Sequence, residues 1–153
     1  SFIGITLVSF GSWWNQYWQI YRVNYSWSWQ YGYKQAVNYV KENYGKYGKI
    51  IFTKRYGEPH EFILFHWPWK PSYYQNDPDK KWDYHTHWYW VDGFDKFQFW
   101  NNWEIKEKLK VSDEEEKILL VTSPGNYIEG GELVKEIDFL HGGTAFEIVS
   151  YEK

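Results

Sequence analysis

The spacing of apolar residues predicts the clearest helix of the chain between residues 33 and 44. Apolar side chains recur there at intervals of three and four residues, namely Tyr33, Ala36, Val37, Val40 and Tyr44. This spacing places them on one face of an α-helix. Gly45 follows directly and can adopt the left-handed conformation that ends many helices. We therefore expect a helix that packs one apolar stripe against the core and ends at Gly45.

Two short apolar runs, residues 49–53 and 117–122, predict buried strands. Between them, Pro59 suits the first position of a second helix, and Glu58 lies near the positive end of that helix. This helix carries the apolar run 62–65 and stops before a proline. A helix, a strand and a helix in succession are typical of an α/β fold.

The last part of the chain predicts a β-hairpin. Residues 133–139 and 144–151 alternate around the glycine-rich turn at Gly142 and Gly143. Three further segments are predicted from the same patterns. They are an extended segment over 21–29, a strand over 94–100 and a charged, solvated connection over 106–117.

The chain of 153 residues is the size of one ordinary domain, so we expect a single core. The predicted fold is α/β: a layered domain with a short mixed sheet flanked by helices and a C-terminal β-hairpin. The soluble domain spans residues 29–153. Residues 1–28 are expected to form a truncated membrane-proximal segment and an entry strand that precede this domain.

The first ten residues contain no charge and are followed by Trp13, Trp14, Tyr17 and Trp18. Ten residues are too few to span a bilayer, which takes about 20 in a helix. Tryptophan and tyrosine at the end of an apolar run are typical of a membrane interface. The segment is therefore interpreted as the end of a membrane helix, and the absence of an initiator Met predicts a larger parent protein. The alternative is a strand that belongs to the core.

The composition predicts a core that is built largely of aromatic side chains. Aromatic residues make up 24% of the chain, whereas the only alanines are Ala36 and Ala145 and methionine is absent. Such an aromatic-rich chain is not a disordered one. The absence of cysteine excludes disulfides and thiolate metal sites. A net charge of −3 provides no basic surface for nucleic acid, so no nucleic-acid partner is expected.

Aromatic residues are densest between Trp67 and Trp90, around an expected short helix at residues 72–75. Sugars stack on flat exposed rings, so this stretch is a candidate carbohydrate-binding surface. The candidate binding residues are Trp67, Trp69, Tyr73, Tyr74, Trp82, Trp88 and Trp90. The alternative, which we favour for most of these rings, is that they fill the core in place of the missing small and aliphatic residues.

Candidate catalytic and metal-binding residues are few. Asp83, His85 and His87 share one face if they lie on a single strand, and they could then bind a metal ion. Packing of the imidazoles beside neighbouring rings is the simpler interpretation. Glu58 and Glu61 are interpreted as helix-start carboxylates and not as a general acid and base. No catalytic residue, resident metal or other cofactor is predicted.

The order of several short segments along the chain resembles a known pattern. These segments are residues 29–34 before the 36–44 helix, 49–53, 56–59, 62–65, 71–75, 118–124, 137–140 and 146–149. This order resembles the C-terminal soluble region of bacterial family-39-like glycosyltransferases, which are related to dolichyl-phosphate-mannose–protein mannosyltransferases. The likeness extends roughly from Phe10 to Val149, although residues 82–90 match nothing in that pattern.

The resemblance implies a membrane enzyme whose donor is a polyprenyl-phosphate-linked sugar. The catalytic acidic residues of such enzymes lie in an early extracytoplasmic loop, which these 153 residues do not contain. The implied role is a non-catalytic, membrane-associated domain on the extracytoplasmic side, which contacts the membrane through its N-terminal segment and contacts a glycan or lipid-linked sugar. The alternative function is a stand-alone carbohydrate-binding module.

Overall fold

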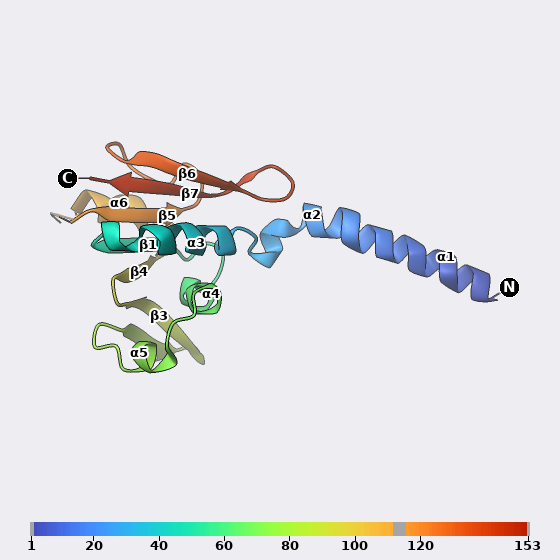
Figure 1. Ribbon diagram of the computed structural model, residues 1–153, viewed down its shortest axis with the longest axis horizontal. Helices are drawn as coiled ribbons and strands as arrows, with labels where there is room; N and C mark the ends of the chain where they lie inside the picture. The colour runs from blue at the N-terminus through green and yellow to red at the C-terminus, as the bar shows by residue number, and fades with distance from the viewer. Residues whose placement is uncertain (1, 112–115, 153) are drawn as a thin grey trace.

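The structure, a computed structural model, describes residues 2–111 and 116–152 and has an α/β fold. Its centre is a mixed seven-stranded sheet in the order β2-β3-β4-β1-β5-β7-β6 (Figure 1). The strands are β1 (Lys49–Thr53), β2 (Lys81–His85), β3 (Trp88–Phe94), β4 (Phe97–Trp100), β5 (Ile118–Thr122), β6 (Glu132–Asp138) and β7 (Thr144–Tyr151). The predicted fold class is confirmed, but the sheet is larger than the short sheet expected.

The middle of the sheet is parallel and its two sides are antiparallel. Strand β1 pairs in parallel with β4 on one side and with β5 on the other. The hairpin β2–β3 extends the sheet beyond β4, and the hairpin β6–β7 extends it beyond β5. The three parallel strands β4, β1 and β5 therefore end at the same edge of the sheet.

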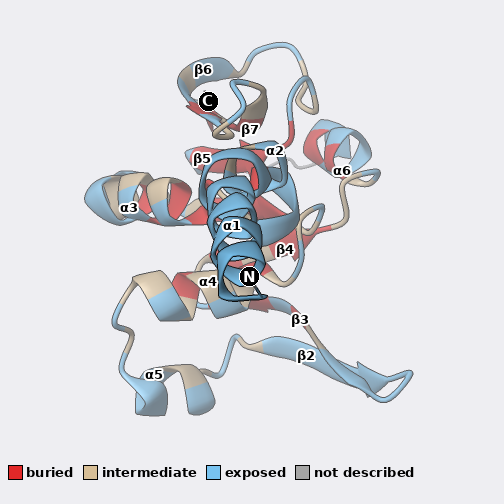
Figure 2. Cartoon of the chain, turned by 90° about the vertical axis from the view of Figure 1, so that its right-hand side faces the viewer, coloured by how far each residue is buried: buried red, intermediate tan, exposed pale blue. Residues whose placement is uncertain are grey.

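Helices cover both faces of the sheet, giving three layers (Figure 2). Helices α3 (Tyr33–Asn43), α4 (Pro59–His66) and α5 (Pro71–Gln75) lie on one side, and α6 (Ile105–Val111) lies on the other. Side chains alternate along β1 accordingly. Ile50 and Phe52 join the cluster under α3 and α4, whereas Ile51 joins the cluster under α6.

Most predicted elements are confirmed. Helix α3 buries the apolar stripe read from the sequence, Pro59 begins α4, and the C-terminal hairpin is formed by β6 and β7. The end of α3 differs from the prediction. Gly45 does not adopt a left-handed conformation, because the chain continues into the 3-10 helix η3 (Tyr44–Lys46).

The predicted extended segment over 21–29 is wrong, because the chain is helical there. Helix α1 (Phe2–Asn15) continues through the π-helix η1 (Gln16–Tyr21) into α2 (Arg22–Asn24), and the 3-10 helix η2 (Ser26–Trp29) follows. Aromatic residues recur every fourth residue here, a spacing that brings rings together on a helix. Tyr21 stacks on Tyr17 and on Tyr25, with ring centroids 6.1 Å and 4.8 Å apart.

Two further predictions need correction. The charged segment over 106–117 contains α6, because Ile105 and Leu109 lie one helical turn apart and are both buried. Residues 112–115 of that segment lie outside the described residues. The expected strand over 94–100 is divided between β3 and β4, and Asp95 adopts a left-handed conformation in the tight turn between them.

Large rings contribute much of the core, as expected. The largest fully buried side chains include Tyr33, Phe52, Phe94, Phe97 and Phe146. Tyrosine and phenylalanine perform this role more than tryptophan does. Of the twelve tryptophans, all of which lie within residues 2–111, only Trp100 is buried.

Candidate functional site

The N-terminal helix projects away from the folded domain (Figure 1). No residue of α1 is buried, and exposed fractions reach 84% at Phe2 and 71% at Ile3. The alternative in which this segment is a strand of the core is therefore wrong. Within residues 2–111 and 116–152, no helix combines the length and apolar character that crossing a membrane requires.

Aromatic rings form a continuous collar at the base of α1, made of Trp13, Trp14, Tyr17 and Trp18. Their ring centroids lie 5.7–6.3 Å from one another in successive contacts. Arg22, the first charged residue of the chain, follows one turn later. An apolar hollow of about 370 Å³ lies between this part of the helix and Leu140 of the β6–β7 turn, with Arg22 at its margin.

The β2–β3 hairpin lies at one edge of the sheet and is exposed along most of its length (Figure 2). The strand register places Trp82, Tyr84 and Tyr89 on one face, and each is more than half exposed. The ring of Tyr89 is tilted by 48° from both other rings. The face is therefore aromatic and accessible, but its three rings do not lie in one plane.

The other candidate carbohydrate-binding residues are dispersed. Trp67, Trp69 and Tyr74 are partly buried and pack against the core. Tyr73 is exposed on α5, away from the hairpin. Trp88 and Trp90 lie on the opposite face of the hairpin from Trp82. The structure thus divides the predicted aromatic set between core packing, an exposed position on α5 and two faces of the hairpin.

The predicted metal-binding arrangement of Asp83, His85 and His87 rests on a wrong premise, because β2 ends at His85. Thr86 and His87 form the two-residue turn of the hairpin, both with positive φ. Asp83 and His85 do share a face, with Oδ2 and Nδ1 3.1 Å apart. Among the residues that the structure describes, no group of three or more potential metal ligands is found.

A crevice lies at the carboxyl ends of β1 and β4. After β1 the chain turns to α4 on one face of the sheet, whereas after β4 it turns to α6 on the other face. In open α/β sheets, ligands bind where neighbouring strands diverge in this way. A hollow of about 410 Å³ opens at this point. Its lining residues are Lys54, Arg55, Gly57, Glu58, Trp90, Asn101, Asn102 and Trp103.

Asn102 fixes the loop after β4 to its neighbours. Its Oδ1 atom accepts hydrogen bonds from the hydroxyls of Thr53 at 3.0 Å and Ser123 at 2.7 Å, and from the amide of Asn126 at 3.0 Å. These donors come from the ends of β1 and β5. The three parallel strand ends are thereby joined by one side chain, which makes this edge of the sheet a rigid base for the crevice.

Two titratable side chains lie almost buried behind the crevice. Oε2 of Glu58 lies 3.6 Å from Nδ1 of His60, and neither atom has a hydrogen-bond partner among the described residues. Burial raises the pKa of Glu58, an effect that nearby Lys54 opposes. Burial, together with Lys54, lowers the pKa of His60 to about 4, so this imidazole is neutral at pH 7.

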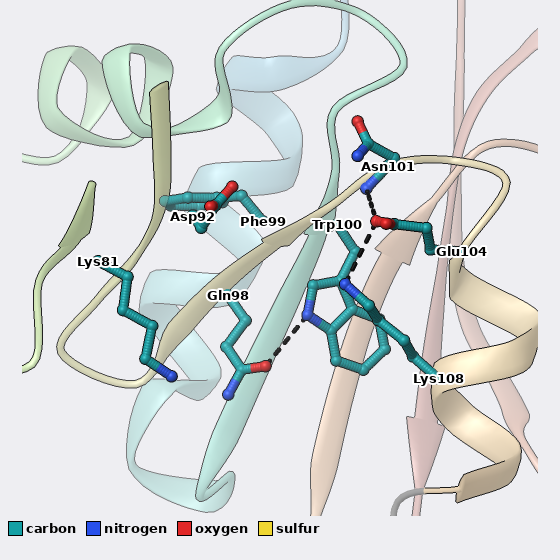
Figure 3. A pocket seen from close by; sticks show the side chains of 8 residues that line it. All are labelled: Lys81, Asp92, Gln98, Phe99, Trp100, Asn101, Glu104 and Lys108. Carbon is teal, nitrogen blue, oxygen red and sulfur yellow. Dashed lines mark hydrogen bonds and ion pairs between the residues drawn. The ribbon is translucent and has the colours of Figure 1, made fainter. Parts of the chain in front are cut away.

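A second hollow, of about 370 Å³, adjoins the crevice and shares Asn101 with it (Figure 3). Glu104 accepts hydrogen bonds there from the backbone N–H of Asn101 at 3.1 Å and from Lys108 at 3.3 Å. The indole of Trp100 donates to Gln98 at 3.1 Å. The charged residues that line this second hollow are Lys81, Asp92, Glu104 and Lys108, so positive and negative charges balance there.

The sequence interpretation missed most of the crevice. Lys54 and Arg55 directly follow one predicted strand, and Asn101 to Trp103 directly follow another. Residues at the carboxyl ends of parallel strands are the usual ligand contacts of an α/β sheet, and that position is the signal that could have identified them.

Comparison with protein-family models, with curated proteins and with solved structures finds no match for this chain. What the chain does is therefore inferred from the chemistry and placement of its own residues.

Proposed function

We propose that this chain is the non-catalytic extracytoplasmic domain of a membrane glycosyltransferase that uses a polyprenyl-phosphate-linked sugar donor. The observation that carries the proposal is the N-terminal helix, which is uncharged from Phe2 to Tyr21 and has no buried residue along α1. The exposed apolar side chains of such a helix favour an apolar environment, and a lipid bilayer provides one without a specific complementary surface.

The physical basis for membrane attachment is the exposed apolar area of α1. Moving an exposed side chain such as Phe2, Ile5 or Leu7 out of water contributes roughly 1.5–3 kcal/mol. The collar of Trp13, Trp14, Tyr17 and Trp18 then lies at the level that indole and phenol rings favour in a bilayer, between acyl chains and water. The attachment proposed is insertion of the apolar end of α1 with the collar at the interface.

The assignment to a glycosyltransferase draws on the order of the segments that resemble family-39-like enzymes. The placement of the crevice is compatible with this role. The strands β1, β4 and β5 end on the side of the domain from which α1 departs (Figure 1). A domain attached through α1 would therefore direct this edge of its sheet toward the membrane, where a lipid-linked sugar lies.

Membrane attachment is tested by flotation of the whole chain with vesicles of phosphatidylethanolamine and phosphatidylglycerol. We expect the protein to float with the vesicles and Leu7→Glu to abolish flotation, because a carboxylate is costly in the apolar layer. Val111→Glu is the control, since Val111 is also highly exposed, at 81% against 66% for Leu7, but lies on α6. Absence of flotation of the unsubstituted chain, or equal flotation of both variants, would contradict the proposal.

The enzymatic context is tested separately by the reading frame upstream of Ser1. A membrane glycosyltransferase requires many hydrophobic spans there, together with an acidic residue in an extracytoplasmic loop. A frame without such spans would remove the glycosyltransferase assignment, even if α1 binds vesicles.

A second candidate function is glycan binding by the β2–β3 hairpin. It is favoured by the exposure of Trp82, Tyr84 and Tyr89 on one face. If this face binds glycans, the double variant Trp82→Ala with Tyr89→Ala should lose retention on immobilised polysaccharide, whereas Trp27→Ala, which removes an equally exposed ring elsewhere, should not. Unchanged retention of the double variant would exclude this face as the binding surface.

A further inference from the structure

We propose that the crevice at the carboxyl ends of β1 and β4 binds an uncharged saccharide. The crevice lies at the point where the connections after these two strands leave for opposite faces of the sheet. Its volume of about 410 Å³ falls within the range of roughly 300–1,000 Å³ that small-molecule sites occupy.

The lining of the crevice offers the two kinds of contact that a sugar ring needs. Trp103 is 77% exposed although it borders the hollow, so a flat indole face is available for the C–H face of a sugar. Trp90 also lines the hollow, where its ring stacks on His85 with the ring centroids 5.4 Å apart. Around them, Arg55 supplies hydrogen-bond donors, and the side-chain amide of Asn101 can both donate and accept. Sugar hydroxyls both donate and accept, so this mixture matches them.

The charge distribution favours an uncharged ligand over a phosphate-rich one. The ammonium of Lys54 lies 2.5 Å from the carboxylate of Asp92, so this cation is already paired. Glu58 adds negative charge beside Arg55. The turn after β1 contains a single glycine, Gly57, and so lacks the glycine-rich loop that phosphate-binding strand–helix turns use.

The base of the crevice is preorganised. Three hydrogen bonds to Oδ1 of Asn102 connect the loop after β4 to the ends of β1 and β5. Lys54 lies 5.9 Å from the ring of Trp90 and pairs with Asp92, which places the indole of Trp90 against the end of β1. A ligand therefore meets groups that are already positioned, which limits the entropy lost on binding.

The test is titration of the whole chain with methyl glycosides of the common hexoses, followed by calorimetry and by NMR of the indole N–H groups. We expect at least one glycoside to bind and Trp103→Ala to weaken that binding about tenfold, equivalent to about 1.4 kcal/mol. Trp103 is highly exposed, so this variant should fold. Trp27→Ala, which removes an exposed ring that does not line the crevice, is the matched control and should leave the affinity unchanged.

Three outcomes would overturn the inference. They are the absence of binding by every glycoside, binding that Trp82→Ala weakens and Trp103→Ala does not, and binding of hexose 1-phosphates alone with loss in Arg55→Ala. The last outcome would identify an anion site. The titration uses soluble sugars and no membrane, so its result is independent of vesicle flotation.

Discussion

Nδ1 of His60 lies 3.6 Å from Oε2 of Glu58 in an almost buried position behind the crevice. Both atoms lack a hydrogen-bond partner among the described residues. Burial disfavours the charged form of each group, so the stability of the fold should depend on pH.

The first prediction concerns His60, whose pKa falls from 6.5 in the unfolded chain to about 4 in the fold. Between these values the unfolded chain binds more protons, so the stability present above pH 6.5 is lost as pH falls toward 4. We expect this loss to be roughly 1–3 kcal/mol, and His60→Phe to reduce it. Urea unfolding between pH 4 and 7 measures the effect.

Glu58 acts in the opposite direction, because its raised pKa favours the fold below pH 4.5 and disfavours it as pH rises. His141→Phe serves as the control, since His141 is exposed in the β6–β7 turn. If His60→Phe and His141→Phe show the same pH dependence as the unsubstituted chain, His60 is not the group responsible.

The second prediction concerns the hydroxyl of Tyr33, which is buried without a hydrogen-bond partner among the described residues. Tyr33→Phe removes an unsatisfied polar atom and keeps the ring, which stacks on Phe62 at 4.0 Å. We expect the free energy of unfolding to rise by about 1 kcal/mol. The hydroxyl of Tyr151 bonds to the backbone of Ile128, so Tyr151→Phe should instead lower stability by about 1 kcal/mol. Equal effects of the two variants would refute this explanation.

The third prediction concerns Gly32, which precedes α3 with a φ of +110°. A Cβ atom there would lie 3.0 Å from the ring of Phe146 and 3.3 Å from Cβ of Ala145. We expect Gly32→Ala to lower the free energy of unfolding by about 1–3 kcal/mol. Gly45 has open space and no positive φ, so Gly45→Ala should change it by less than about 0.5 kcal/mol. Thermal unfolding of both variants would show whether the difference exists.

The fourth prediction concerns Asn102, whose Oδ1 atom accepts three hydrogen bonds at the strand ends. Asn102→Ala leaves the hydroxyls of Thr53 and Ser123 without this acceptor, whereas the amide of Asn126 keeps its hydrogen bond to the backbone carbonyl of residue 102 at 2.7 Å, so stability should fall by about 2–3 kcal/mol. Asn76→Ala is the control, since the Asn76 side chain donates one hydrogen bond to the backbone of Ser72 on an exposed surface. A loss in Asn102→Ala no larger than that in Asn76→Ala would show that the network at the strand ends contributes little.

The sequence was informative where local spacing decides structure. The apolar stripe of α3, the runs that form β1 and β5, and Pro59 at the start of α4 all act over a few residues. The β2–β3 hairpin could not be recognised in the same way. Its turn consists of Thr86, a β-branched residue that rarely adopts positive φ, and His87, so the usual glycine or asparagine signal is missing.

The crevice required the order of strands in space. Strand β4 lies beside β1 although α4, α5, β2 and β3 come between them in the chain. The local sequence pattern does not show that β1 and β4 are neighbours, so spacing alone could not predict that Arg55 and Trp103 line the same crevice. Spacing alone also could not divide the predicted aromatic set between core and surface, because Trp67 and Trp69 pack against core residues from other parts of the chain.

The distribution of indoles has a spectroscopic consequence. Because Trp100 is the only buried tryptophan of the twelve, intrinsic fluorescence is emitted mainly by rings that already contact water. Unfolding should therefore shift the emission maximum only slightly, so this signal is a poor measure of the unfolding of the core. The same emission should change strongly when a bilayer or a sugar covers the exposed indoles. In this protein, tryptophan fluorescence therefore reports on binding more than on folding.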